Sequence, residues 1–378
     1  MSEELSFAPV DVQALPGPAR RILGEGAPPP MRLMAAKGVI PGIKPADLVT
    51  VVALLSDAAE QQVADTARAT LANLPPPVLG GALSADLEPV VIHRLALAQA
   101  GRADVVEKLL RLPRIAAPTL SWLAQQADER IGELIATNEE LMLKNPVVIE
   151  KLYMNKRVRM STSDRLIELA VRNGIELTIP AFKEAAAAIM NELIPEPTEE
   201  PTFDDELFQR TELIAEQTQL AADDEDTHET DDEGEEHLRT KFLPLHAQIA
   251  EMTVSQKIRR AMLGTSAERL LLVRDTNRLV SAAAIKSPMV KENEVVMISA
   301  SRSVNEDVLR LIALSREHTR SYQVKLNLVS NPRTPLTFAA RLVPHLRESD
   351  LKSIAKSKNV SGAIAQIVRQ QLSRKTKS

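Results

Sequence analysis

The segment Ser330-Asn331-Pro332-Arg333 ends one amphipathic helical pattern and precedes the next, and it has two counterparts earlier in the chain. These are Lys144-Asn145-Pro146-Val147 and Lys286-Ser287-Pro288-Met289. A small polar residue tolerates the backbone conformation found at helix ends, and proline stops a helix because it has no N–H group to donate. Each of the three segments therefore predicts a junction between two helices.

A second recurring element consists of a small polar residue, a basic residue, one further residue and valine. It occurs as Asn155-Lys156-Arg157-Val158, Ser301-Arg302-Ser303-Val304 and Ser357-Lys358-Asn359-Val360. An amphipathic helix follows each copy, such as the helix that carries Leu309-Arg310-Leu311-Ile312-Ala313. A pair of such helices has an apolar face that it cannot bury alone, so neighbouring pairs must stack. We therefore expect an α-solenoid.

Helical patterns of this kind account for most of the N-terminal half as well. They cover residues 46–55, 63–73, 87–99, 103–111, 118–126 and 128–137, and prolines and glycines separate them. No segment shows the alternation of apolar and polar residues typical of a strand. The predicted fold class is all-α, with residues 1–45 as a mostly extended N-terminal lead-in that holds one short helix near residues 20–23.

Through its two recurring elements, the chain resembles the HEAT-like and leucine-rich-variant family of bacterial α-helical repeats. The resemblance covers residues 100–194 and 252–373, with a weaker extension back to residue 46. It implies tandem helical repeats that present a concave surface to proteins or nucleic acid. The two elements are about 10, 14 and 26 residues apart in the three copies, and an additional helix over residues 336–342 is inserted in the last.

Charge divides the chain further. Residues 195–238 contain 18 acidic residues and one basic residue, Arg210, whereas residues 239–378 contain 25 basic and 10 acidic residues. We expect residues 46–194 and 239–378 to be two helical-repeat domains, joined by an acidic disordered linker over 195–238. Within that linker, residues 203–220 carry an apolar stripe at helical spacing. This segment either docks on a partner or continues one of the flanking helical arrays.

Composition limits the classes of function. The chain has no cysteine, which excludes disulfides, thiol catalysis and thiolate metal sites. We expect a cytoplasmic location, because no secretory signal pattern begins the chain and no segment approaches the ~18 apolar residues of a membrane span. None of the six histidines pairs with another at the spacing of a helical metal site. The segment around Gly264 is among those most similar to a glycine-rich phosphate-binding loop, but it is better explained as a helix C-cap followed by an N-cap at Thr265 or Ser266. We therefore predict no catalytic residues, no cofactor and no metal, and a protein that is not an enzyme.

The basic C-terminal domain carries the strongest functional signal. Arg302 and Lys358 occupy the same place in successive repeats, so stacking predicts a basic stripe along one edge, with Lys156 on the corresponding edge of the N-terminal array. The alternative is a solvated face that only maintains solubility. The candidate residues for binding a polyanion or a partner are Lys257, Arg259, Arg260, Arg302, Arg316, Arg320, Lys352, Lys356 and Lys358.

These features predict a non-catalytic scaffold or adaptor that binds a protein partner through its helical-repeat surfaces. The alternative is a nucleic-acid-associated protein that makes sequence-independent phosphate contacts, because aromatic residues are only 2% of the chain and base stacking requires them. The acidic linker, with a net charge of −17, is tethered to a basic array of +15. We therefore also expect an intramolecular contact between the two.

Overall fold

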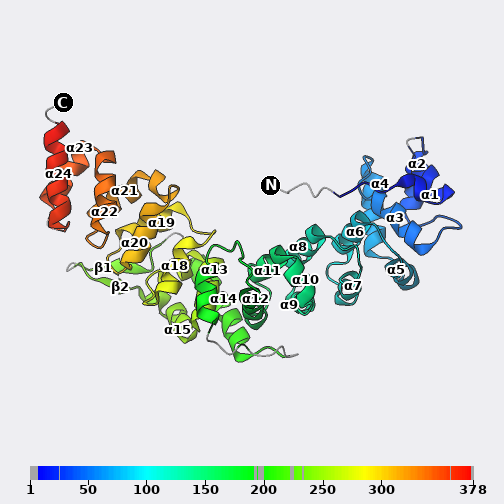
Figure 1. The fold of residues 1–378 in the computed structure, drawn as a ribbon, viewed down its shortest axis with the longest axis horizontal. Coiled ribbons are helices and arrows are strands. Elements are labelled where there is room, and N and C mark those ends of the chain that lie inside the picture. Colours follow the sequence, from blue (N-terminus) through cyan, green and yellow to red (C-terminus); the bar gives the residue numbers. More distant parts are fainter. Residues whose placement is uncertain are drawn as a thin grey trace. The chain divides into compact units, whose positions relative to one another are not determined.

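The computed structural model describes residues 7–24, 26–190, 194, 200–221, 225–231, 234–357 and 359–375. Within these ranges the protein is helical, with 24 α-helices, four short 3₁₀ segments and one two-stranded hairpin (Figure 1). The chain divides into two compact units, Met1–Leu166 and Ile167–Ser378. The division falls inside a helix, α12 (Met160–Arg172), and the domain limits at residues 46, 195 and 239 stay a prediction.

The first unit consists of short helices arranged in two rows. In one row α2, α4, α6 and α8 each pack against the next, and in the other α1 packs against α3 and α3 against α5. Their cores are aliphatic, as the composition predicts. The helices are α1 (Gly17–Leu23), α2 (Pro29–Ala36), α3 (Pro45–Leu55), α4 (Gln61–Ala72), α5 (Pro76–Leu83), α6 (Pro89–Gln99), α7 (Ala103–Leu109), α8 (Ala117–Gln126), α9 (Glu129–Ala136), α10 (Glu139–Lys144) and α11 (Pro146–Tyr153).

Two helices of this unit were not expected. The lead-in predicted as mostly extended contains α2, and the break between the helical patterns predicted over residues 63–73 and 87–99 contains α5. Both helices begin at prolines, which the sequence interpretation treated as helix breakers. A proline at the first helical position loses no hydrogen bond and has the required φ angle, so it starts a helix as readily as it stops one.

The second unit repeats the two-row arrangement. In one row α16, α18, α20, α22 and α24 each pack against the next, and in the other α17 packs against α19 and α19 against α21. At Gly264 the expected C-cap is present, and Thr265 caps the following helix. The helices are α13 (Phe182–Ile189), α14 (Phe203–Ala221), α15 (Leu243–Glu251), α16 (Val254–Leu263), α17 (Ser266–Leu272), α18 (Arg278–Lys286), α19 (Glu292–Ala300), α20 (Glu306–Leu314), α21 (Tyr322–Ser330), α22 (Leu336–Leu342), α23 (Glu348–Lys356) and α24 (Gly362–Lys375).

The polar residues of the recurring elements join successive helices within each unit. Asn331 Nδ2 donates to the carbonyl oxygens of Ser299 and Ser301, at 3.0 and 2.7 Å. In the first unit, Asn155 Nδ2 makes the same kind of contact with Ala127, at 2.8 Å. Ser287 Oγ donates to Met262 O at 3.0 Å. These side chains satisfy carbonyls that a helix end leaves without a partner, which explains why a small polar residue recurs there.

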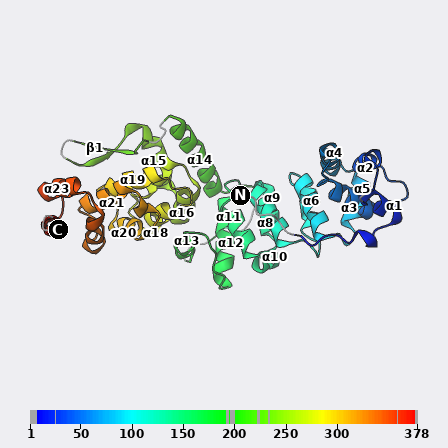
Figure 2. The same cartoon turned by 90° about the horizontal axis from the view of Figure 1, so that it is seen from above.

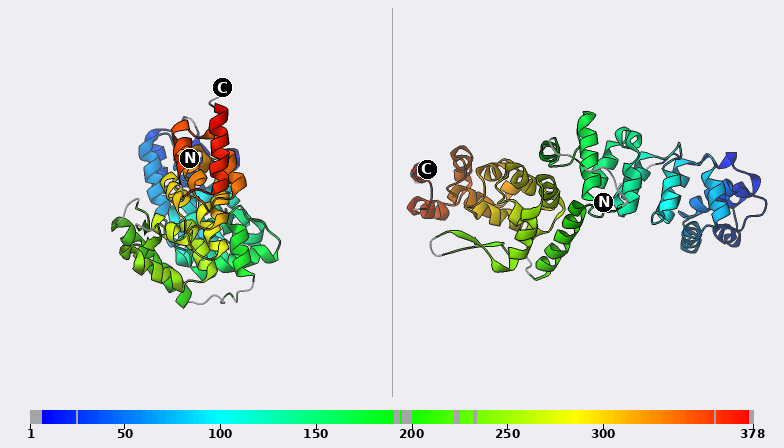
Figure 3. Two further views of the ribbon diagram at one scale, coloured as in Figure 1. Left: turned by 90° about the vertical axis from the view of Figure 1, so that its left-hand side faces the viewer. Right: turned by 90° about the horizontal axis from the view of Figure 1, so that it is seen from below.

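The acidic segment differs from the disordered linker that its composition predicts. Its described part contains α14 and a hairpin of β1 (His228–Thr230) and β2 (Glu236–Leu238), paired antiparallel with His228 opposite Leu238. The hairpin lies along the helices of the second unit (Figures 2 and 3). Residues 195–199, 222–224 and 232–233 lie outside the described residues. Composition predicts disorder because it counts the acidic residues without their partners. In the structure, basic side chains such as Arg239, Lys241 and Arg274 pair with some of them.

Candidate partner-binding groove

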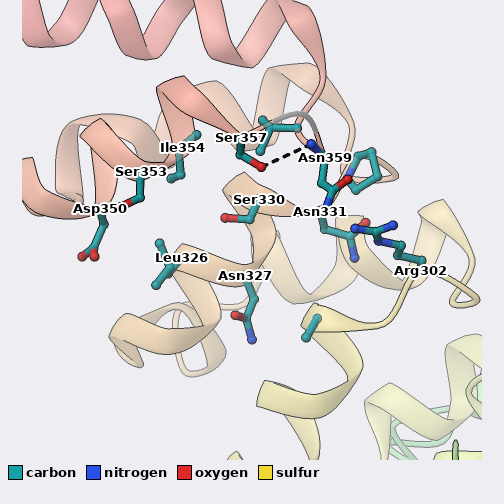
Figure 4. A pocket seen from close by; sticks show the side chains of 13 residues that line it. Arg302, Leu326, Asn327, Ser330, Asn331, Asp350, Ser353, Ile354, Ser357 and Asn359 are labelled. Carbon is teal, nitrogen blue, oxygen red and sulfur yellow. Dashed lines mark hydrogen bonds between the residues drawn. The ribbon is translucent and has the colours of Figure 1, made fainter. Parts of the chain in front are cut away.

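A groove lies between α21 and α23 in the second unit (Figure 4). Its volume is about 440 Å³. The two helices share an apolar core beside the groove, to which Val329 of α21 and Ile354 of α23 belong, but α21 packs most closely on α19 and α23 on α24. The lining residues come from α21 and α23 and from the loops that follow α19, α21 and α23, which are the recurring sequence elements. They are Ala300, Arg302, Leu326, Asn327, Ser330, Asn331, Pro332, Asp350, Ser353, Ile354, Ser357, Asn359 and Val360.

One end of the groove is closed by a contact between the first turns of its two helices. Tyr322, at the start of α21, donates its hydroxyl proton to the carboxylate of Asp350 in the first turn of α23. The Tyr322 oxygen in turn accepts from the backbone N–H of Arg347 at 3.0 Å, and the Arg347 guanidinium lies 4.7 Å from the ring centroid. Burial and the neighbouring Asp350 carboxylate raise the pKa of Tyr322. This end is therefore fixed, and its carboxylate already has a hydrogen-bond donor.

The α21 wall of the groove is also held in place. Asn327 Nδ2 donates to Val296 O at 2.9 Å, which anchors the middle of α21 to α19. Asn331 anchors its end in the same way. Since the carboxamide N–H groups of both residues are used within the fold, the groove has a pre-formed wall.

The other end is open, and polar groups gather there. Arg302, Ser357 and Asn359 lie together at this end, away from Asp350 (Figure 4). Ser357 Oγ accepts from the backbone N–H of Asn359 at 3.2 Å. The side chains of Arg302 and Asn359 are exposed. Apolar side chains of Leu326, Ile354 and Val360 complete the lining, so the groove combines hydrogen-bonding groups with an apolar surface.

A carboxylate from the acidic hairpin is bound beside this open end. Glu236 accepts from Ser301 Oγ at 2.7 Å, from Ser303 Oγ at 2.6 Å and from the backbone N–H of Arg302 at 2.6 Å. Burial acts to raise the pKa of Glu236, but these hydrogen bonds and the charge of Arg274 outweigh burial and lower it. The loop Ser301–Ser303 is therefore a carboxylate-binding loop that the chain itself occupies.

Basic side chains pair with two further acidic residues beside the hairpin. Arg274 Nη2 donates to both carboxylate oxygens of Asp226, at 3.1 and 3.2 Å, and only 6% of the Arg274 side chain is exposed. Arg239 and Lys241 both pair with Glu225. Glu225 and Asp226, beside the hairpin, and Glu236 within it are thus in direct contact with basic and polar side chains of the second unit.

Three of the predicted binding residues lie in α16, and α14 covers two of them. Arg259 and Arg260 are fully buried, with their guanidinium groups 5.1 and 4.8 Å from the ring centroid of Phe208. Arg260 pairs with the buried Glu268 at 2.6 Å, and Lys257 pairs with Asp275 at 3.0 Å. Because α14 covers them, Arg259 and Arg260 do not belong to an exposed basic stripe. Their sequence pattern reflects packing against an acidic helix.

The other predicted residues lie in different places. Arg302 borders the groove, Lys352 pairs with Glu348 at 2.5 Å, and Arg320 and Lys356 are exposed. Lys358 lies outside the described residues. Arg316 lines a second cavity of about 280 Å³, together with Arg341, His345 and Phe338. Sequence reasoning missed Arg341 and His345 because they belong to no recurring element.

No group of three or more histidine, aspartate or glutamate side chains within the described ranges is placed to hold a metal ion. Across the same residues, no helix combines the length and apolar character that crossing a membrane requires. Comparisons of the chain with protein-family models, with curated proteins and with solved structures give no match.

Proposed function

We propose that this protein is a non-catalytic, cytoplasmic adaptor of the HEAT-like helical-repeat kind, and that it binds a polypeptide segment of a partner protein in the α21–α23 groove. One observation carries the proposal: a groove of about 440 Å³ opens between α21 and α23, and loops from three of the recurring sequence elements line it together with both helices. Repeat proteins bind partners on surfaces that extend over neighbouring repeats in this way.

The chemistry of the lining supports a polypeptide ligand. Hydroxyl and carboxamide groups of Ser330, Ser353 and Asn359 supply donors and acceptors along the groove, and Leu326 and Ile354 supply apolar surface. Peptide main chain requires both kinds of contact. The volume of about 440 Å³ falls in the range of ~300–1,000 Å³ that is usual for ligand sites.

Site-specific photo-crosslinking in cells tests the proposal. A benzophenone amino acid would replace Ser353 in the groove or, as a control, Gln323, an exposed residue of α21 that does not line it. We expect the position-353 variant to give a protein adduct of defined mass that resists nuclease, and the position-323 variant to give none. Equal adducts at both positions, or adducts that nuclease removes, would contradict binding of a protein in the groove.

The second cavity favours nucleic acid as the alternative partner. Arg316 and Arg341 form no ion pair among the described residues, and they line the same cavity as His345 and Phe338. Guanidinium groups of this kind bind phosphates without reading sequence. If this is the main function, affinity for a random DNA duplex should fall steeply with salt, and an Arg316→Ala, Arg341→Ala double variant should reduce the slope of log Kd against log salt by about two.

A further inference from the structure

We propose that the open end of the α21–α23 groove binds an aspartate or glutamate carboxylate of the partner segment, through Ser357, Asn359 and Arg302. This inference rests on the proposed function and specifies the chemical class of the segment. The argument starts from Glu236, because this carboxylate shows how a recurring loop of the same unit binds an acidic side chain.

The loop after α23 is the counterpart of the loop after α19. Both begin with a serine that ends its helix, and the backbone angles of the two serines agree, with φ −66° and ψ 137° at Ser301 and φ −70° and ψ 133° at Ser357. In each loop the serine contacts the residue two positions later. Ser301 Oγ lies 3.1 Å from Ser303 Oγ, and Ser357 Oγ accepts from Asn359 N at 3.2 Å. The two loops therefore present similar polar groups.

The two loops differ in what they bind. The first is occupied by Glu236 from the acidic hairpin. Of the described residues, none places a carboxylate on Ser357 or on the side chain of Asn359, and the cavity lies directly against both. A hydroxyl and a carboxamide can each donate to a carboxylate oxygen. The second loop is thus open to a carboxylate from another polypeptide.

Charge favours an acidic ligand at this end. Arg302 is an exposed residue that borders the groove; its Nη1 lies near Gly234 of the acidic hairpin, yet it forms no ion pair within the described part of the chain. Asp350, the acidic residue of the lining, is at the far end, where Tyr322 donates to it (Figure 4). A hydrogen bond to a charged acceptor is about twice as strong as one between neutral groups. An acidic side chain should therefore bind here more tightly than a glutamine side chain.

The test compares two fluorescein-labelled peptides, one of alternating leucine and glutamate and one of alternating leucine and glutamine. Binding to the full-length protein would be measured by fluorescence anisotropy at low ionic strength, where charge pairing is least screened. We expect the acidic peptide to bind and the glutamine peptide to bind at least about tenfold more weakly. Equal binding of the two peptides would overturn the inference while leaving the proposed function intact, since crosslinking at position 353 reports on that separately.

Variants of the groove test which side chains bind the carboxylate of the acidic peptide. Ser357→Ala with Asn359→Ala, and separately Arg302→Ala, should each weaken binding of the acidic peptide about five- to tenfold, because each removes donors worth roughly that factor. Arg320→Ala removes the same charge from an exposed residue that does not line the groove, and it should change the affinity less than about twofold. If Arg320→Ala matches Arg302→Ala, the attraction is non-specific and the inference fails.

A competition experiment separates the carboxylate from other anions. Acetate and inorganic phosphate would be added to the complex with the acidic peptide at matched ionic strength. If the site binds a carboxylate, acetate should displace the acidic peptide at least as well as phosphate does. Displacement by phosphate at much lower concentration than acetate would instead identify a phosphate site and overturn the inference. Far-UV circular dichroism of each variant confirms that it remains helical.

Discussion

Asn331 and Ser301 are 30 residues apart in sequence, yet the Asn331 side-chain amide donates to the Ser301 carbonyl oxygen at 2.7 Å. In the first unit, Asn155 contacts Ala127 in the same way at 2.8 Å, across 28 residues. Both asparagines are less than 10% exposed, and each also accepts from the backbone N–H two residues later. One asparagine therefore joins two successive repeats and shapes the loop between them.

Replacing either asparagine by alanine should destabilise its own unit. The change leaves buried carbonyls without a donor, which costs ~1–3 kcal/mol. The midpoint of urea unfolding would be followed by circular dichroism for Asn331→Ala and by the fluorescence of Trp122, the single tryptophan, for Asn155→Ala. Asn359→Ala is the control, because that side chain is exposed, and its midpoint should not move. Equal effects at the three positions would show that the two buried asparagines do not join repeats.

The contact of Gly132 with Val158 should tolerate no added methyl group. A Cβ atom at position 132 would lie 2.8 Å from Val158 Cγ2, closer than van der Waals contact allows. Gly132→Ala is therefore expected to destabilise the first unit by ~1–3 kcal/mol. Val158→Ala removes the clashing methyl groups, so adding it to Gly132→Ala should recover part of the loss. A double-mutant cycle from urea unfolding measures this coupling, and strict additivity would contradict it.

Stability of the first unit should depend on pH through His93. Burial, followed by the charge of Arg94, lowers the pKa of His93 from 6.5 to about 4. Between these values the unfolded chain binds a proton that the folded state does not. Stability contributed by His93 is therefore complete above pH 6.5, and it falls as the pH decreases toward 4, by up to ~1.4 kcal/mol per pH unit.

Trp122 reports this change directly, because its ring centroid lies 6.5 Å from that of His93. Urea unfolding followed by its fluorescence from pH 7 to 4.5 should show a falling free energy of unfolding in the native protein. In His93→Gln, which cannot titrate, this part of the pH dependence should disappear. An unchanged slope in the variant would assign the dependence to other groups.

The acidic hairpin should be released when Glu236 loses its charge. The pKa of Glu236 is lowered in the folded protein, so its contribution is present above the ordinary value of 4.5 and is lost as the pH falls through the lower folded value. Glu236→Gln should mimic this loss at neutral pH and increase amide hydrogen exchange in β1 and β2 about five- to tenfold. Glu229→Gln makes the same change at an exposed position of the hairpin, and its exchange should remain that of the native protein.

Local features of the sequence determined much of the fold. Helices such as α3, predicted over residues 46–55, and the cap at Gly264 depend on residues a few positions apart. The recurring Asn and Ser residues marked the helix junctions because small polar residues suit helix ends, although their contacts differ: Asn145 bonds within its own helix, whereas Asn331 reaches the preceding repeat. The start of α5 was missed because proline is compatible with both ends of a helix.

Only the tertiary structure decided which charged residues are available for binding. Arg260 and Glu268 are both hidden beneath α14, and Arg302 is left at the edge of a groove, although all three look alike as charged positions in a helical-repeat sequence. The groove lies where α23 packs most closely on α24 rather than on α21, with which it shares only part of an apolar core. Burial and gaps are set by contacts between residues far apart in the chain, and composition and spacing carry no record of those contacts.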